Sequence, residues 1–152
     1  MFAILRKRKK IFTEEEIRLI EKAISDAEHQ TSGEVRVFVE SHCSWVDAID
    51  RAAEIFFSLK MEKTEQRNAV LVYVAIKDRQ LAVFGDEGIH NKVGDEYWNK
   101  VVGEMLTSFN SSNYAQGISN CVTRIGEALK TYFPFNGDTD INELPDEIVF
   151  GR

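Results

Sequence analysis

The feature that most constrains the fold is a run of eight apolar residues in the middle of the chain, Ala69 to Ile76. The run is rich in β-branched residues and is apolar on both faces, a pattern typical of a central strand that is covered on both sides. It is far shorter than the roughly 20 residues that a membrane-spanning helix needs. A polar turn over residues 77–80 and a second apolar run, Leu81 to Phe84, follow it and predict a β-hairpin.

Two helices and a strand are expected before this hairpin. Thr13 and Glu16 have the spacing of a capping box, which predicts the start of a helix. Residues 34–40 alternate between apolar and mostly charged side chains, which indicates a strand with one better-buried face. Ser44 and Asp47 again have a capping spacing, so a second helix is expected to begin there, with an apolar inner face made of Val46, Ile49, Ala53, Phe56 and Phe57.

The order strand, helix, strand implies a right-handed crossover between two parallel strands, the one at 34–40 and the central one. The hairpin then adds an antiparallel strand, so the sheet is mixed. A loop is expected over residues 85–94, and two helices are predicted after it, spanning about 95–109 and 114–133. We therefore expect an α/β fold in which a mixed β-sheet is sandwiched between helices.

Charge is distributed unevenly along the 152 residues and divides the chain into a basic N-terminal arm (1–12), a globular domain (13–134) and an acidic C-terminal tail (135–152). The arm carries five basic residues and no acidic ones, whereas the rest has 14 basic and 25 acidic residues, a net charge of −11. So acidic a domain repels phosphates, and no nucleic-acid partner is expected. The arm is interpreted as a solvated tail, with contact to an anionic membrane as the alternative, and the tail as extended or mobile.

The chain is expected to be a cytoplasmic monomer. Its basic run follows the apolar residues Met1 to Leu5 instead of preceding a longer apolar segment, so it does not have the pattern of a secretory signal. Two cysteines, Cys43 and Cys121, are too few for a secreted disulfide framework. Both thiols are therefore expected to be free.

Three loops are expected to converge on one rim of the sheet, here called the acidic rim: residues 31–34, 65–68 and 85–88. Glu34, Asp86 and Glu87 offer hard oxygen ligands there. Carboxylates about 4 to 5 Å apart repel by roughly 3 to 4 kcal/mol per pair at an effective dielectric constant of about 20, so calcium or magnesium is a natural guest. Two alternatives stay open: Arg67 neutralises these carboxylates, or they are solvated loop acids.

Further candidates lie close to these carboxylates. Arg67, Asn68 and His90 are candidates to contact a substrate or to support the metal ligands. On the opposite rim, formed by residues 41–44 and 77–79, His42 and Cys43 suggest metal or nucleophile chemistry, although adjacent residues at a strand end diverge. The chain has no nucleophile elbow, zinc-protease motif or P-loop. Any hydrolase activity would therefore have to be assisted by a metal.

The stretch from Thr64 to Arg79, followed by Val83 to Ile89, resembles the TPM domain. The resemblance extends from about Ile11 to Pro134 and rests on a strand, an Asp-Arg turn, a second strand and a glycine loop in fixed order. The TPM family includes thylakoid-lumen proteins of photosystem repair, some described as acid phosphatases, and many small bacterial proteins of unknown role. The resemblance implies a mixed sheet between helices and, as in some members, a divalent-ion site whose glycine loop corresponds to Gly85 to Gly88.

Two functions follow as hypotheses. The first is a divalent-metal-binding TPM domain with weak metal-dependent phosphatase activity, in which the acidic rim holds the ion. The second is a non-enzymatic interaction module that binds a protein or membrane partner. The chain has no complete set of acid, base and nucleophile, which favours the second hypothesis over catalysis but does not argue against metal binding.

Overall fold

The computed structural model describes residues 11–135 and 147–151; the basic run of the arm and most of the acidic tail lie outside the described residues. The elements follow one another as α2 (Glu14–Glu28), β1 (Glu34–Glu40), α3 (Ala48–Ser58), the short 3-10 helix η1 (Met61–Lys63), β2 (Ala69–Ala75), β3 (Gln80–Gly85), α4 (Glu87–Asn110), α5 (Tyr114–Tyr132) and β4 (Val149–Phe150).

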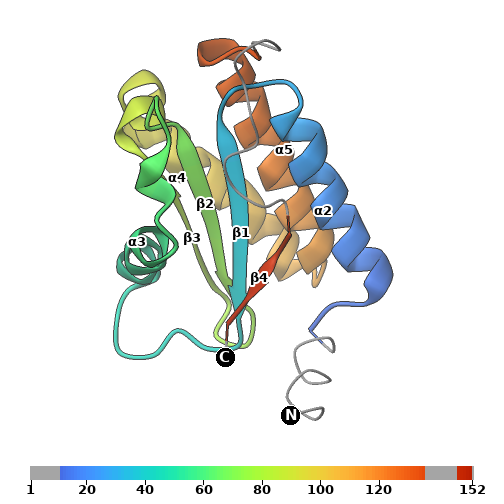
Figure 1. The fold of residues 1–152 in the computed structure, drawn as a ribbon. Helices are drawn as coiled ribbons and strands as arrows, with labels where there is room; N and C mark the ends of the chain where they lie inside the picture. The colour runs from blue at the N-terminus through green and yellow to red at the C-terminus, as the bar shows by residue number, and fades with distance from the viewer. Residues whose placement is uncertain (1–10, 136–146, 152) are drawn as a thin grey trace.

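The strands form one mixed sheet in the order β3-β2-β1-β4 (Figure 1). β1 runs parallel to β2, with Glu34 opposite Ala69, and β2 runs antiparallel to β3, with Val70 opposite Gly85. The expected α/β class, the parallel crossover and the hairpin are thus confirmed. Residues 149–150 pair in parallel with β1, although no strand was expected in the tail; two residues are too few to show a periodicity in the sequence.

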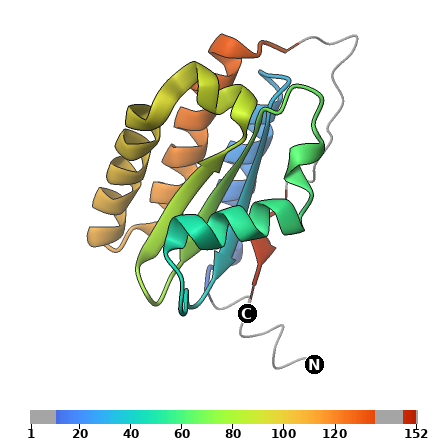
Figure 2. The same cartoon turned by 90° about the vertical axis from the view of Figure 1, so that its left-hand side faces the viewer.

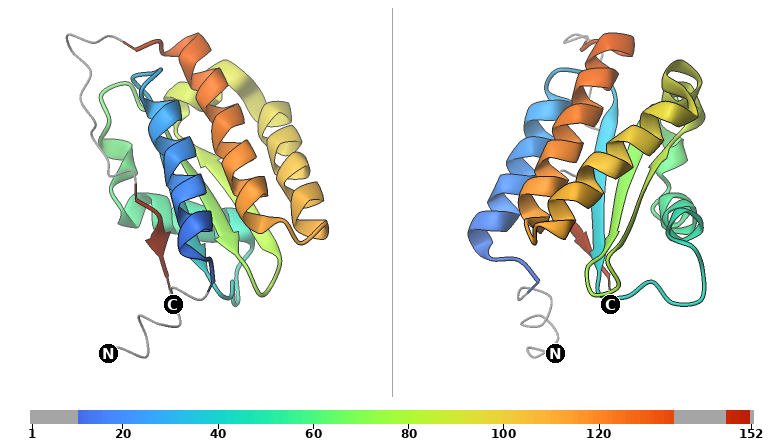
Figure 3. Two further views of the ribbon diagram at one scale, coloured as in Figure 1. Left: turned by 90° about the vertical axis from the view of Figure 1, so that its right-hand side faces the viewer. Right: turned by 180° about the vertical axis from the view of Figure 1, so that it is seen from behind.

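Helices cover both faces of the sheet and give it two apolar layers. α2, α5 and α4 lie side by side on one face (Figure 3), where they form one apolar layer with Val35, Val37 and Val39 of β1 and Leu81 and Val83 of β3. α3 covers the other face and packs on Leu71 and Tyr73 of β2. β2 is apolar on both faces because it contributes to both layers. None of the helices in the described residues is long and apolar enough to cross a bilayer.

The two helix starts predicted from capping patterns have different outcomes. In α2 the Thr13 side chain accepts from the Glu16 backbone and the Glu16 side chain accepts from the Thr13 backbone, so the capping box is confirmed. In α3 the cap is Asp47, without a side-chain cap bond, and Ser44 lies outside the helix. The predicted inner face is confirmed only at Phe56, which is buried together with Ala52 and Ile55. Three other residues predicted for that face are exposed instead: Val46, Ile49 and Phe57.

The expected loop over residues 85–94 is mostly helix. Asp86 caps α4, its side chain accepting from the backbone N–H of Glu87 at 2.8 Å. Gly94, with φ of 78°, kinks the helix instead of ending a loop before it. Gly88 is required at its place because a Cβ there would lie 2.1 Å from the backbone oxygen of Gln66. The glycines that predicted a loop therefore serve a kink and a close helix-loop contact.

Candidate functional site

β3 is an edge strand of the sheet in the part of the chain that the structure describes. Among residues 11–135 and 147–151, β3 pairs only with β2. The N–H of Asp86 donates to the oxygen of Ala69 at 2.9 Å, and bonded pairs alternate in an antiparallel ladder. It follows that residues 80, 82 and 84 bond to β2, whereas the N–H and C=O groups of Leu81, Val83 and Gly85 point to the open edge.

A groove of about 1030 Å³ runs along this open edge, between α3 and α4. Figure 2 shows the edge from outside, with the two helices on either side of it. β3 contributes every residue from Leu81 to Gly85 to the lining. Ile49 and Phe57 come from α3, whereas Trp98 and Val102 come from α4. The groove therefore combines unpaired backbone groups with apolar walls on both sides.

Exposed apolar side chains are concentrated on α3 and the loop before it. Ile49 and Phe57 are 48% and 50% exposed, Val46 is exposed, and Trp45 is fully exposed with a left-handed φ of 75°. Phe57 packs edge-on against Phe84 of β3, with ring centroids 6.0 Å apart. The segment holds more apolar residues than one helix face can bury, and the surplus lies at the groove and beside it.

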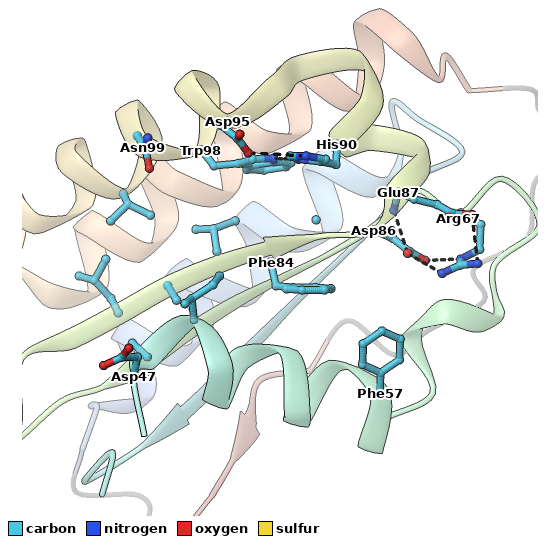
Figure 4. Close-up of a pocket in the computed structure, with 17 residues that line it drawn as sticks. Asp47, Phe57, Arg67, Phe84, Asp86, Glu87, His90, Asp95, Trp98 and Asn99 are labelled. Atoms are coloured by element: carbon cyan, nitrogen blue, oxygen red, sulfur yellow. Dashed lines mark hydrogen bonds and ion pairs between the residues drawn. The ribbon is translucent and has the colours of Figure 1, made fainter. Parts of the chain in front are cut away.

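The acidic rim closes one end of the groove (Figure 4). The expected convergence of its loops is confirmed, because Arg67 contacts Asp86 and the N–H of Gly88 donates to the Arg67 oxygen at 2.8 Å. The guanidinium of Arg67 donates to both Asp86 oxygens, at 2.7 and 2.8 Å, and to Glu87 at 3.2 Å. These bonds to Asp86 raise the pKa of Arg67. The Asp86 side chain is only 4% exposed, so it is a buried carboxylate with a cationic partner.

The donor set at this rim does not fit a divalent ion in the observed arrangement. Both Asp86 oxygens are engaged by Arg67, and one of them also accepts from the backbone of Glu87. Glu34 is buried at the start of β1 and is not among the groove-lining residues. Within the described part of the chain, no three His, Cys, Asp or Glu side chains are gathered closely enough to hold a metal. Metal binding at Glu34, Asp86 and Glu87 stays a prediction.

The other two candidates at this rim have structural partners. Asn68 is buried, and its side chain donates to the Ser32 hydroxyl at 3.3 Å, which ties two of the loops together. His90 lines the groove, and its Nδ1 accepts from the indole N–H of Trp98 at 3.0 Å. Because an indole can only donate, His90 carries its proton on Nε2, which lies 3.6 Å from Asp95. A role for either residue in substrate contact stays a prediction.

The opposite rim contains a polar network that the sequence only partly indicated. Asp78, in the hairpin turn, accepts from His42 at 2.8 Å and from the backbone N–H of Cys43 at 2.7 Å. The bond from His42, followed by that from Cys43, lowers the pKa of Asp78. Behind them Tyr73 donates to buried Glu40, whose oxygens accept from Arg51 at 3.0 and 3.1 Å. The loops of this rim converge as expected, but His42 is paired with a carboxylate and not with a nucleophile.

The groove was not predicted from the sequence, because it exists only if β3 lies at an edge of the sheet, and the strand order is not visible in local sequence patterns. That β3 lies at an edge depends on the position of β4, which no local pattern revealed. One signal was present: α3 and the loop before it carry two apolar stripes, one ending at Phe56 and one at Phe57, and a helix against a sheet buries only one. A surplus stripe next to an uncharged strand indicates a binding surface.

Comparisons with known proteins agree on one family. A sequence model of the TPM domain matches residues 5–128, which is most of the chain. The BA42 protein from the psychrophilic bacteria Bizionia argentinensis sp. nov., solved by NMR, is 41% identical, with a TM-score of 0.84 over 92% of this chain and 95% of that one.

A second solved structure shares the fold alone. The N-terminal domain of the cg2496 protein from Corynebacterium glutamicum, also solved by NMR, has a TM-score of 0.62 at 14% identity, over 78% of this chain and 74% of that one. No curated protein sequence matches this chain. The groove at β3 must therefore be interpreted from its own residues.

Proposed function

This chain belongs to the TPM domain family, and we propose that it is a non-enzymatic interaction module that binds an extended polypeptide segment along the free edge of β3. The observation that carries the proposal is an unprotected edge strand lying in an apolar groove. Strand addition of this kind uses main-chain hydrogen bonds for affinity and side-chain pockets for specificity.

The composition of β3 supports this use. Exposed edge strands are usually blunted by charged residues, proline, bulges or shortness, because they otherwise recruit further strands. β3 has six residues, Gln80–Gly85, with no charge and no proline. Three of its residues present outward N–H and C=O groups, enough to bond an added strand of about six residues, or roughly 20 Å.

The walls of the groove define the chemistry of the segment. A strand added beside β3 has α3 on one face and α4 on the other, so its side chains meet Ile49 and Phe57 on one side and Trp98 and Val102 on the other. If apolar and polar residues alternated along the added strand, its polar side chains would all face one of the two apolar walls. A run that is apolar on both faces fits the groove better. We therefore propose a segment with about four to five consecutive apolar residues, matching a strand of typical length.

The ends of the groove favour basic flanking residues. Asp47 lies at one end and Glu87 at the other, and Asp95 lies between them on the α4 side (Figure 4). Arg67, the cation at the lining, is already engaged by two carboxylates. Lysine or arginine on either side of the apolar run would meet exposed acids, which increases the association rate and favours the correct register.

The test is an NMR titration of the 15N-labelled chain with a synthetic octapeptide that has four consecutive valine residues between pairs of lysines. We expect shift changes at Leu81, Val83 and Gly85 and at the α3 and α4 walls. Ile49→Asp places a charge in the apolar wall and should raise the Kd at least about tenfold. Leu19→Asp is the matched control, because Leu19 is 38% exposed on α2, outside the groove lining.

Two results would contradict the proposal. One is an octapeptide that leaves the amides of β3 unchanged at near-millimolar concentration. The other is equal weakening by Ile49→Asp and Leu19→Asp, which would mean that the peptide contacts the surface without using the groove.

A further inference from the structure

We infer that the segment bound in this groove is the N-terminal arm of a second copy of this chain, an inference that rests on the proposed function. Residues 1–10 lie outside the described residues, and the inference rests on their sequence, on the chemistry of the groove and on the place where the described chain begins. In place of the expected monomer, the chain would associate reversibly through its own arm.

The arm has the composition that the groove requires. Met1 to Leu5 are five consecutive apolar residues, and Arg6 to Lys10 are five consecutive basic ones. Five residues in a strand span about 17 Å, close to the length of β3. The apolar run matches the walls at Ile49 and Trp98, and the basic run follows it directly, within reach of the acids at a groove end. Outside residues 1–12 the chain has a net charge of −11, which favours contact with a basic segment.

The place where the arm leaves the domain favours a second copy over the arm's own groove. Phe12 is buried and packs against Phe150 of β4, with ring centroids 6.5 Å apart. The arm therefore starts at the β4 side of the sheet, and β3 is the opposite edge (Figure 1). Three strand spacings of about 4.8 Å separate these edges, roughly 14 Å before the helices are passed.

Within one chain, that crossing would use up the basic half of the arm. The five residues from Arg6 to Lys10 reach at most about 17 Å when fully extended. Nearly all of that reach would be needed to cross the sheet, and the basic side chains would then lie away from Asp47, Glu87 and Asp95. The arm of a second copy has no such constraint. It can place both its apolar and its basic run along the groove.

The test compares full-length variants by sedimentation equilibrium from micromolar to near-millimolar concentration. For the wild type we expect an average mass that rises with concentration above the 17.4 kDa of one chain. Ile4→Asp with Leu5→Asp changes only the arm, and Ile49→Asp changes only the groove; each protein alone should stay monomeric. Leu19→Asp should associate like the wild type.

Mixing the two defective proteins is the decisive step. The arm variant retains an intact groove and the groove variant retains an intact arm, so a mixture should form a complex with one copy of each. The octapeptide should bind the arm variant and should dissociate the wild-type assembly.

Three outcomes would overturn the inference. The wild type could stay monomeric throughout, the arm variant could associate as the wild type does, or the mixture could fail to form a complex. If the octapeptide still binds the β3 edge in any of these cases, the proposed function stands and only the identity of the bound segment is wrong. If the octapeptide also fails to bind, both are wrong.

Discussion

The two edges of the sheet are built in opposite ways. β4 has only two residues, Val149–Phe150, and the neighbouring N–H of Ile148 donates to Glu21 of α2 at 3.3 Å. β3 has six uncharged residues and an outer side that lies in a groove between two helices. Shortness is a common means of protecting an edge, and here Glu21 also accepts a backbone N–H beside the strand. The chain protects one edge of its sheet and leaves the other open, which is why the open edge is interpreted as functional.

The largest expected effect is a difference in the free energy of unfolding between two glycine substitutions, one at each edge of the sheet. A Cβ on Gly85 would lie 2.3 Å from the Trp98 ring, in the wall of the groove. Gly85→Ala should lower the free energy of unfolding by about 2 to 3 kcal/mol, because the packed indole has to move. Gly151→Ala meets the Phe38 ring at 2.6 Å but should cost less than about 1 kcal/mol, since β4 can detach locally. Urea denaturation measures both, and equal losses would contradict this difference between the edges.

The second prediction concerns the end of the open groove, where Arg67 holds the buried carboxylate of Asp86. Arg67→Met leaves that carboxylate without its cation, so the melting temperature should fall. It also frees the oxygens of Asp86 and Glu87 for a metal. Calcium should therefore raise the melting temperature more in this variant than in the wild type, because a ligand of the native state stabilises it by RT ln(1 + [L]/Kd).

Scanning calorimetry with calcium and with a chelator measures this difference, and Asp86→Asn in the Arg67→Met background is the control. If calcium raises the melting temperature of the wild type as much as it raises that of the Arg67→Met variant, Arg67 does not compete with a metal at this rim. The predicted metal site would then gain support in the native arrangement.

A smaller effect is expected at the hairpin turn that begins β3. The pKa of Asp78 is lowered in the folded state by the bonds from His42 and from the backbone of Cys43. A lowered folded-state pKa stabilises the protein at pH values above the unfolded-state value of about 3.9, and this stability is lost as pH falls through the folded-state pKa. Asp78→Asn should therefore melt below the wild type at pH 7, with a difference that shrinks below about pH 4. A difference independent of pH would show that charge at Asp78 is not involved.

The sequence predicted those parts of the fold that depend on local patterns. The continuous apolar run at β2, the capping box at Thr13 and the hairpin turn each have a local physical cause, and each is confirmed. The inner face of α3 was predicted correctly at Phe56 but wrongly at Ile49 and Phe57. Its segment has two apolar stripes, and which one faces the sheet depends on tertiary packing. The glycines at 85–94 predicted a loop because glycine signals conformational freedom, whereas here Gly88 provides space for a neighbouring backbone.

The candidate site was predicted only in part, for a related reason. The convergence of loops at the acidic rim followed from strand directions, and Arg67 was considered there as a neutralising partner, which it is for Asp86. β3 carries no charge and no proline that would mark it as an edge strand. The open edge of β3 became visible only when the two-residue strand β4 was found on the far side of β1.

Amide hydrogen exchange along β3 tests the central claim most directly. In dilute free protein the amides of Leu81, Val83 and Gly85, which point outward, should exchange faster than those of Ala82 and Phe84, which bond to β2. Saturation with the octapeptide should slow the outward amides selectively and remove this two-residue alternation, because a strand added to β3 bonds to every second residue. Protection that is unchanged by the peptide, or that rises equally at inward and outward amides, would contradict strand addition at β3.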